Sequence, residues 1–251
     1  MIIDCHIHPT AAVGGSPADC AKELLPFADR MGIEMMGVSL GPRFFPQPTE
    51  AQIEADNDFN ARLIKLHPDR FFSYANLNPN YLRHSLEELD RRVANGPFVG
   101  IKLWIALCCA HPNLDPICEW AAELGAPILQ HTFLRAGGNL PHESSPADLV
   151  ALAARHPDVT FIAAHAGLDW ERGLATVAPR PNILVDTCGF DPEMGFTEMA
   201  VRELGARRVV YGSDATGRSF ASQLAKVRGA DISEETRCRV LGGNMRSVLH
   251  L

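Results

Sequence analysis

Two histidines, His6 and His8, lie two positions apart at the end of a short apolar run near the start of the sequence. If this run is a β-strand, side chains at positions i and i+2 point to the same face, so the two imidazoles project together. Paired imidazole nitrogens are typical ligands of a divalent transition-metal ion such as zinc. Taken alone, the pair fits either a metal site or two ordinary surface or core histidines.

Other apolar runs also end in side chains that can bind metal or transfer protons. His131 ends Pro-Ile-Leu-Gln-His, His165 ends Phe-Ile-Ala-Ala-His, Asp214 ends Val-Val-Tyr-Gly-Ser-Asp, and Lys102 lies near the end of Phe-Val-Gly-Ile-Lys-Leu-Trp. An ionisable group placed there without a partner would incur a desolvation penalty. The repetition therefore predicts one shared site for these groups and one or two divalent metal ions.

The runs that carry these groups belong to a series of eight apolar segments that covers the whole chain. We predict strands at residues 2–8, 35–40, 71–77, 98–104, 127–131, 160–165, 183–187 and 209–214. Their nearly continuous hydrophobicity is typical of parallel strands that are covered on both faces. Helical patterns lie between them, at residues 17–31, 50–67, 82–95, 114–124, 146–155 and 233–251.

This alternation of strands and helices has no linker and favours a single α/β domain over residues 1–251. Eight units in a chain of 251 residues match the usual size of a TIM (β/α)₈ barrel. In that fold the carboxyl ends of all strands meet on one face, where the active site lies. The barrel would therefore bring the metal-capable side chains together.

Composition and charge limit the partners and the compartment. The net charge of −7 gives no reason to expect nucleic acid or an anionic membrane as a partner. The start, MIIDCHIH, does not resemble a signal peptide, and no apolar run approaches the roughly 20 residues of a membrane span. Seven cysteines without a Cys-x-x-Cys pair suit reduced thiols, so we expect a cytoplasmic protein.

Six short motifs occur in a fixed order along nearly the whole chain. They are Ile3-Asp4-Cys5-His6-Ile7-His8, Gly100-Ile101-Lys102-Leu103, Leu129-Gln130-His131-Thr132, Ala164-His165-Ala166-Gly167, Tyr211-Gly212-Ser213-Asp214 and Gly243-Asn244. In this combination the chain resembles the amidohydrolase superfamily. Within it, the chain is most similar to the amidohydrolase-related group of TIM-barrel metal-dependent hydrolases and decarboxylases.

The resemblance implies a role for each matching residue. His6, His8 and His131 would be metal ligands, and Asp214 would be a ligand that also handles the catalytic proton. His165 would bind a second metal or polarise the substrate or water. A bound zinc ion can lower the pKa of its water to roughly 7, and a neighbouring carboxylate can accept the proton.

Lys102 has two interpretations. The resemblance to two-metal members of the superfamily implies that it reacts with CO₂ to form a carbamate that bridges two ions. Such a reaction needs a neutral amine, and burial beside a metal favours that form. The alternative is an unmodified ammonium that binds a substrate carboxylate, with a single metal ion.

Residues just beyond the strand ends are candidates for substrate binding. Arg135 and Arg218 each follow a predicted ligand by four residues, and they would either bind a substrate carboxylate or form surface salt bridges. Trp104, Phe133 and Phe190 would line a pocket or pack against the barrel rim.

Three functions are compatible with such a site. The first is hydrolysis of an amide, lactone or ester of a small molecule by metal-bound hydroxide. The second is non-oxidative decarboxylation of a small aromatic acid, and the third is metal binding without catalysis. We favour a hydrolase, because both histidines of the pair are present, the loops are short, and Lys102 suits the two-metal form. The sequence does not identify the substrate, and it leaves a homo-oligomer open.

Overall fold

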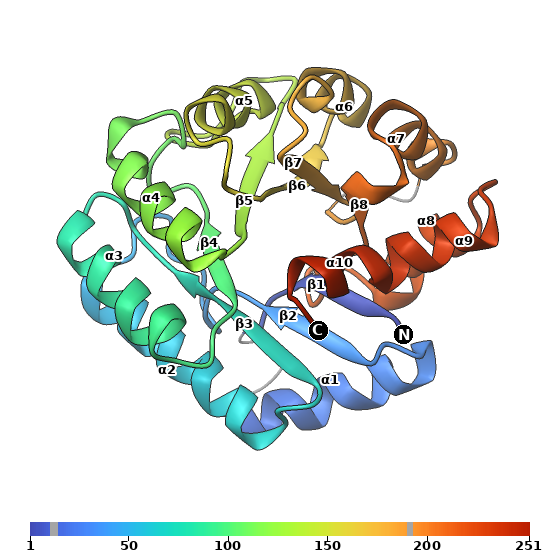
Figure 1. Cartoon of the computed structure of the whole chain (residues 1–251). Helices are drawn as coiled ribbons and strands as arrows, with labels where there is room; N and C mark the ends of the chain where they lie inside the picture. The colour runs from blue at the N-terminus through green and yellow to red at the C-terminus, as the bar shows by residue number, and fades with distance from the viewer. Residues whose placement is uncertain (11–14, 190–192) are drawn as a thin grey trace.

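Eight parallel strands form one sheet that curls into a ring (Figure 1). The computed structural model describes residues 1–10, 15–189 and 193–251. The strands pair in chain order: β1 (Ile3–Ile7), β2 (Met35–Val38), β3 (Phe71–Asn76), β4 (Gly100–Leu103), β5 (Ile128–Phe133), β6 (Phe161–Gly167), β7 (Ile183–Asp186) and β8 (Val209–Val210). All eight predicted strands are confirmed, most of them one to four residues shorter than expected.

The ring closes between the first strand and the last. The Cys5 N–H donates to the Tyr211 carbonyl over 2.9 Å, and the Asp214 N–H donates to the His6 carbonyl over 2.8 Å. These bonds join β1 to the chain just after β8, so the two strands farthest apart in the sequence become neighbours. The predicted single TIM barrel is therefore confirmed.

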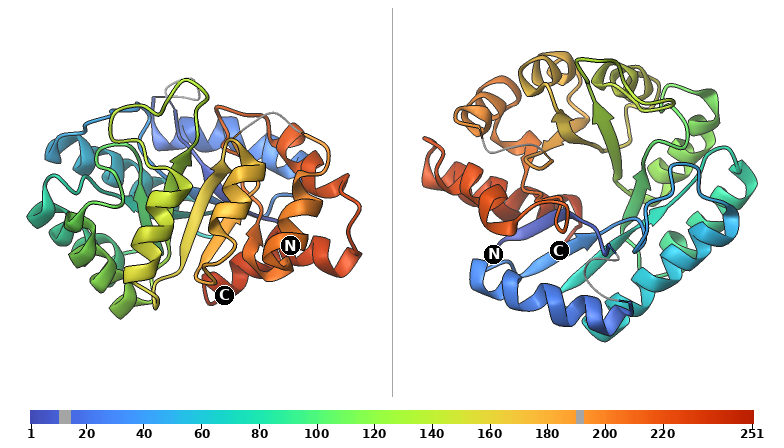
Figure 2. Two further views of the ribbon diagram at one scale, coloured as in Figure 1. Left: turned by 90° about the horizontal axis from the view of Figure 1, so that it is seen from above. Right: turned by 180° about the vertical axis from the view of Figure 1, so that it is seen from behind.

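Helices surround the strands in a nearly continuous outer layer (Figures 1 and 2). They are α1 (Pro17–Met31), α2 (Glu50–Leu66), α3 (Leu82–Leu89), η1 (Asp90–Ala94), η2 (Pro112–Leu114), α4 (Asp115–Leu124), α5 (Pro146–Arg155), α6 (Trp170–Val177), α7 (Phe196–Leu204), η3 (Ala206–Arg208), α8 (Phe220–Arg228), α9 (Glu234–Cys238), η4 (Arg239–Gly243) and α10 (Asn244–Val248). The six predicted helical segments are confirmed, whereas α6, α7 and α8 were not predicted.

Several helices begin at a residue that the sequence makes a good cap. Thr49 and Gln52 form a reciprocal capping box at the start of α2, and Ser145 and Asp148 form another at the start of α5. Gly32 ends α1 in the left-handed conformation, which glycine adopts at little cost. Local sequence therefore fixes where these helices start and stop.

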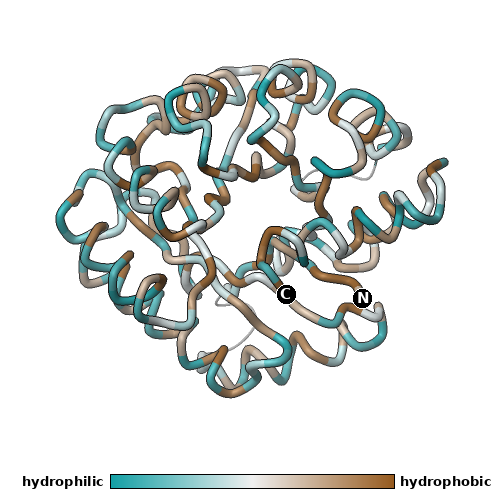
Figure 3. Tube along the Cα trace, in the orientation of Figure 1, coloured by the Kyte–Doolittle hydropathy of each residue, from teal (hydrophilic) through white to brown (hydrophobic). Residues whose placement is uncertain are grey.

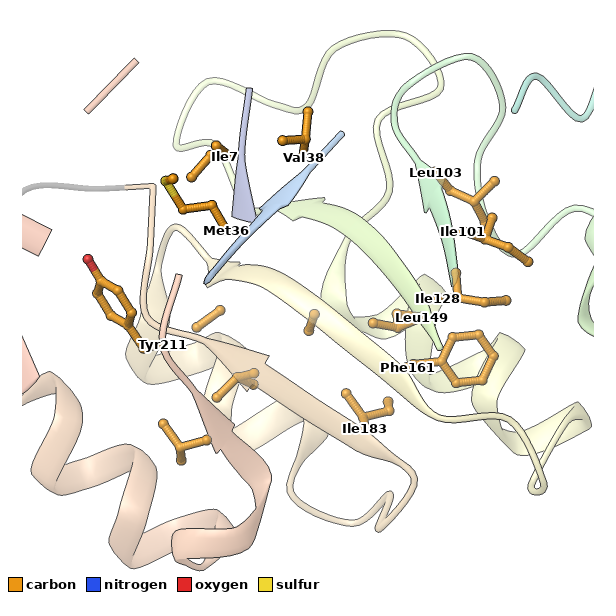
Figure 4. Close-up of a cluster of buried hydrophobic side chains, with 14 of the residues drawn as sticks. Ile7, Met36, Val38, Ile101, Leu103, Ile128, Leu149, Phe161, Ile183 and Tyr211 are labelled. Atoms are coloured by element: carbon orange, nitrogen blue, oxygen red, sulfur yellow. The ribbon is translucent and has the colours of Figure 1, made fainter. Parts of the chain in front are cut away.

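Alternate strand residues pack on opposite faces of the barrel wall. In β6, Phe161 and Ala163 belong to the outer apolar cluster with helix residues such as Leu149, and Figure 4 shows part of this cluster. Ile162 and Ala164 belong to a separate inner cluster. The hydropathy trace shows many apolar segments along the strands and polar segments on the outer turns of the helices (Figure 3). Both faces of the strands are thus buried.

The C-terminal segment closes the end of the barrel where the strands begin. Met245 of α10 packs into the inner cluster, and the Asn244 side-chain amide donates to the carbonyls of Ala206 and Val209 over 2.6 and 2.7 Å. This gives the Gly243-Asn244 motif a structural role. None of the described helices is long and apolar enough to cross a membrane.

Candidate metal centre

Three predicted ligands meet at the carboxyl end of the barrel. His6 Nε2 lies 3.2 Å from His8 Nε2, which in turn lies 3.2 Å from Asp214 Oδ1. His6 Nε2 and Asp214 Oδ1 are 4.0 Å apart. His6 is fully buried, whereas the Asp214 side chain keeps 19% of its surface exposed. Two imidazoles and one carboxylate at this spacing fit a divalent cation that a small molecule can reach.

Asp4 holds the two strands that carry these ligands in register. Its Oδ1 accepts the backbone N–H groups of His6 and Ser213 over 3.1 and 2.9 Å. The imidazole of His8 is oriented from the other side, where Nδ1 lies 2.9 Å from the Ser39 carbonyl. Asp4 therefore fixes the ligand-bearing backbones on β1 and after β8, and it is not itself part of the His6, His8 and Asp214 group.

Asp186, at the end of β7, was not predicted as a site residue. Its Oδ2 lies 2.8 Å from His6 Nδ1, and its Oδ1 accepts the backbone N–H of His165 over 2.8 Å. Burial, the largest single effect, would raise the pKa of Asp186, but the hydrogen bond to His6, the electrostatic interactions with His6 and His165 and the hydrogen bond from the His165 N–H together hold the pKa below its ordinary value. An ionised carboxylate on the far nitrogen of a ligating histidine fixes the ring and raises its basicity.

Lys102 points into the barrel beside His6. Its Nζ lies 2.9 Å from His6 Nε2, and the side chain is almost fully buried. Burial lowers the pKa of Lys102 because the charged form loses its hydration, although Asp186 and Asp214 oppose the shift. Burial thus shifts Lys102 in the direction of the neutral amine that carbamylation requires, the two carboxylates favour the ammonium, and the carbamate itself stays a prediction.

His131 lies on the same face but turns toward an acidic partner. Its Nε2 is 3.0 Å from Glu143 Oε1, a residue of the loop after β5 that was not predicted as a site residue. Arg135 binds the same carboxylate through two hydrogen bonds of 2.7 and 2.9 Å. The guanidinium expected to bind a substrate carboxylate is thus paired with Glu143 in this structure.

His165 completes the group of imidazoles at the centre of this face. Its ring centroid lies 5.2 Å from that of His6 and 5.0 Å from that of His131. Its backbone φ of 66° is left-handed, a strained conformation for a residue other than glycine that is common at functional sites. Because it is buried, the pKa of His165 lies well below its ordinary value, so the ring is neutral at pH 7.

Aromatic side chains form a rim around the imidazoles. The Phe44 ring lies 5.1 Å from that of His8 and 5.5 Å from that of Trp104. Phe133 stacks on His131 with the ring planes 15° apart. Trp104 and Phe133 were expected here, and Phe44, from the loop after β2, was not. The predicted pocket residue Phe190 lies outside the described residues.

Arg218 lies at the edge of this face. It donates to the carbonyls of Gly189 and Gly217 over 3.3 and 3.2 Å, and its side chain is exposed. It also lines a cavity of about 310 Å³ between α1 and α8, together with Phe27 and Phe220. Its predicted contact with a substrate carboxylate stays a prediction.

Fold and site together define a TIM-barrel protein with a metal-type cluster at the carboxyl ends of its strands. A protein-family model described as amidohydrolase matches residues 3–251. The chain therefore belongs to the amidohydrolase family, as the sequence motifs predicted. A search of curated proteins finds no significant match.

Solved structures of low sequence identity share this fold. The 2,6-dihydroxybenzoate decarboxylase from Rhizobium superposes with a TM-score of 0.80 at 17% identity, over 99% of this chain and 98% of that one. A dihydroxybenzoic acid decarboxylase from Polaromonas sp. JS666, with manganese and 2-nitroresorcinol, gives 0.79 at 18% identity over 100% and 97%. The 4-oxalomesaconate hydratase from Rhodopseudomonas palustris gives 0.74 at 17% identity over 100% and 96%.

Proposed function

We propose that this chain is a metal-dependent decarboxylase that releases CO₂ from a small aromatic carboxylic acid. The observation that carries the proposal is the aromatic rim, in which Phe44, Trp104 and Phe133 surround the imidazoles of His8 and His131. Flat rings of this kind stack against a flat substrate at little conformational cost. The two decarboxylases of the same fold add support, and this proposal replaces the hydrolase that the sequence favoured.

The residues that would hold the metal ion are those the sequence singled out. We propose His6, His8 and Asp214 as ligands, with His131 joining them once its ring leaves Glu143. When bound, a divalent ion supplies an electrophile for the oxygen atoms of the substrate and stabilises negative charge that develops on them. Manganese and zinc both fit a site of imidazole and carboxylate ligands.

Asp214 would move the proton in the reaction. We propose that it takes a proton from a hydroxyl group beside the substrate carboxylate and delivers it to the ring carbon that bears this carboxylate. The bond from that carbon to the carboxylate then breaks, CO₂ leaves, and the product keeps the negative charge as a phenolate. Burial, the largest single effect, would raise the pKa of Asp214, but the hydrogen bond to His8 and the electrostatic interactions with the nearby histidines together lower it, so the carboxylate begins ionised, as this step requires.

His165 would hold the carboxylate that is lost. Its neutral imidazole can donate one hydrogen bond to a carboxylate oxygen, which orients the bond that breaks relative to Asp214. Lys102 lies beside His6 and would supply the positive charge for the same carboxylate if it stays unmodified. His165 and Lys102 can bind the carboxylate without Arg135, whose guanidinium is already paired with Glu143.

The test offers metal-loaded protein two panels of compounds. One contains hydroxybenzoates, and the other contains lactones, esters and amides. We expect CO₂ release from at least one hydroxybenzoate, and a loss of at least 100-fold in kcat for Asp214→Asn. The exposed Asp158→Asn is the matched control and should keep full activity. Hydrolysis of the second panel without CO₂ release would contradict the proposal and restore the hydrolase.

Hydrolysis remains the second candidate because of one observation, the buried Lys102 beside His6. A carbamate on Lys102 would favour the two-metal form that suits a hydrolase. Intact mass of protein loaded with metal and bicarbonate tests for it. A gain of one CO₂ that disappears in Lys102→Met would support the carbamate, whereas an unmodified mass would leave Lys102 as a cation for the substrate.

A further inference from the structure

A thiol lies directly behind the candidate metal centre. Cys188 Sγ is 3.1 Å from His6 Nδ1, 3.4 Å from His165 Nδ1 and 3.1 Å from Asp186 Oδ1. All four side chains are buried, and one ligand atom from each lies within 4.8 Å of every other. This group is separate from the His8 and Asp214 side of the site, because it uses the opposite nitrogen of the His6 ring.

The backbone is shaped to make room for this group. A Cβ atom at Gly189 would fall 1.8 Å from His165 Nδ1, so only a glycine lets the imidazole approach Cys188 from this side. Gly189 also has a φ of 89°, which residues with side chains rarely adopt. On the other side of the ring, the left-handed backbone at His165 is held by the hydrogen bond from its N–H to Asp186.

The donors match a soft divalent cation in number, spacing and charge. Two imidazoles, a thiolate and a carboxylate form a four-coordinate set that suits zinc. Metal–ligand bonds of about 2.0–2.3 Å in a tetrahedron place neighbouring donor atoms roughly 3.3–3.7 Å apart. The four shortest contacts, with Asp186 Oδ2 toward His6 and Oδ1 toward Cys188, are 2.8–3.4 Å, and the ligand atoms of the whole set lie within 4.8 Å of one another. The thiolate and the carboxylate together balance the charge of the ion.

We propose that His6, His165, Asp186 and Cys188 form a second, closed metal site that binds a thiophilic divalent ion such as zinc. With both sites filled, His6 bridges them as an imidazolate whose ring proton has been released to solvent, with Nδ1 toward the second ion and Nε2 toward the first. All four positions of this site are filled by protein, so the ion there holds the backbone of β1, β6 and β7 and leaves the chemistry to the open site. The proposal does not depend on which reaction the open site performs.

Cobalt substitution tests the proposal with a readout that is independent of activity. Cobalt(II) is added to metal-free protein while bound metal is counted and the near-ultraviolet spectrum is recorded. We expect two equivalents of cobalt and a sulfur-to-cobalt charge-transfer band that only a thiolate ligand produces. If the band is absent, whether the protein binds one or two equivalents of cobalt, the proposal is overturned.

Variants assign the band to its cysteine. Cys188→Ala should lose the band and one equivalent of cobalt while it keeps the other equivalent. Cys118→Ala is the matched control, because Cys118 is equally buried in α4 but belongs to the outer cluster, and it should keep both. A band that persists in Cys188→Ala would come from another cysteine and would overturn the assignment.

A second variant keeps the test decisive if Cys188→Ala fails to fold. Gly189→Ala keeps all four donors but pushes the His165 ring away, so it should lower cobalt affinity at the thiolate-containing site at least 10-fold. Gly125→Ala is its control, since Gly125 also has a positive φ but an added Cβ there meets nothing within 4 Å. Equal cobalt affinity in the two variants would contradict the proposed site.

Discussion

His6 is the residue around which the site is organised, because each ring nitrogen faces a different set of partners. Nε2 faces His8 and Lys102, and Nδ1 faces Asp186. While no ion lies at Nδ1, Asp186 therefore keeps the ring proton on that nitrogen and leaves Nε2 free to ligate. The carboxylate is as important to the site as the ligands, although it would not touch an ion in the open site.

Asp186→Asn tests this dependence. We expect a 10- to 100-fold loss of affinity for the first equivalent of a divalent metal, because the amide cannot supply the charge that raises the basicity of His6. Metal titration of the metal-free protein measures the loss, and circular dichroism checks the fold. Asp115→Asn removes a carboxylate that pairs with Arg155 and His156 near the surface, and its metal affinity should be unchanged.

Asp56 is a second residue whose surroundings allow a prediction, in this case of how stability changes with pH. It is buried in α2 against the backbone of Gly41, and this burial raises its pKa to about 7, although a hydrogen bond from Asn76 opposes the shift. The folded protein therefore holds this proton more tightly than the unfolded chain, whose Asp has a pKa near 3.9. Its contribution to stability is present below about pH 4 and is lost as the pH rises toward 7.

Asp56→Asn should remove this loss. Between pH 4.5 and pH 8, the free energy of unfolding of the parent protein should fall further than that of the variant, which lacks the titrating carboxyl. The difference between the two changes should be on the order of 1–3 kcal/mol. Urea unfolding at the two pH values measures the difference. Identical pH profiles for the parent and the variant would show that Asp56 is ionised in the folded state, and Asp158→Asn provides the exposed comparison.

Among the elements, α6 packs closely against the strand that carries His165. A Cβ at Gly173 would fall 1.7 Å from the Ala166 carbonyl, which is backbone and cannot move aside as a side chain can. We expect Gly173→Ala to lower the free energy of unfolding by about 1–3 kcal/mol, despite the better helix propensity of alanine. Denaturant unfolding measures it. At Gly137 the added Cβ meets nothing, so Gly137→Ala should change stability little.

The elements also show what the sequence alone can predict. Strands were found because both of their faces are buried, so their apolar runs are nearly continuous, as in Phe161–Gly167. The helix Trp170–Val177 was missed because it is short and contains Gly173, which a propensity argument reads as a weak helix former. Ligands at strand ends were predictable from position. Glu143 was not, because it reaches His131 from a loop whose path local sequence does not fix.

Asp186 was missed for a different reason. It ends an apolar run as His131, His165 and Asp214 do, so the same positional rule could have found it. The predicted strand covered residues 183–187 and ended at Thr187, so the rule left Asp186 inside the strand. Phe44 lies neither at the end of a predicted strand nor in a family motif, and only the folded loop brings it to His8.

At the scale of the whole molecule, the candidate ligands come from opposite ends of the chain and meet only in the closed barrel. A divalent ion should therefore bind the folded state and not the unfolded one, and stabilise it by about 2.7 kcal/mol at 100 times its Kd. For a chain of this size that is a rise in Tm of roughly 5–10 °C. Thermal scans with metal and with chelator measure it. His8→Ala should shrink the rise, and an equal rise in His8→Ala would place the ion elsewhere.

The clamp between Asp4 and Ser213 joins residues that are 209 positions apart. A ribosome adds about 5–20 residues per second, so the imidazoles of the first strand leave it on the order of 10–40 s before Asp214 exists. During that interval the nascent chain contains His6 and His8 but not Asp214, so the ligand set of the open site is incomplete. An ion at the open site therefore cannot direct the folding of the first strands during synthesis, because its full ligand set exists only after residue 214 has been added.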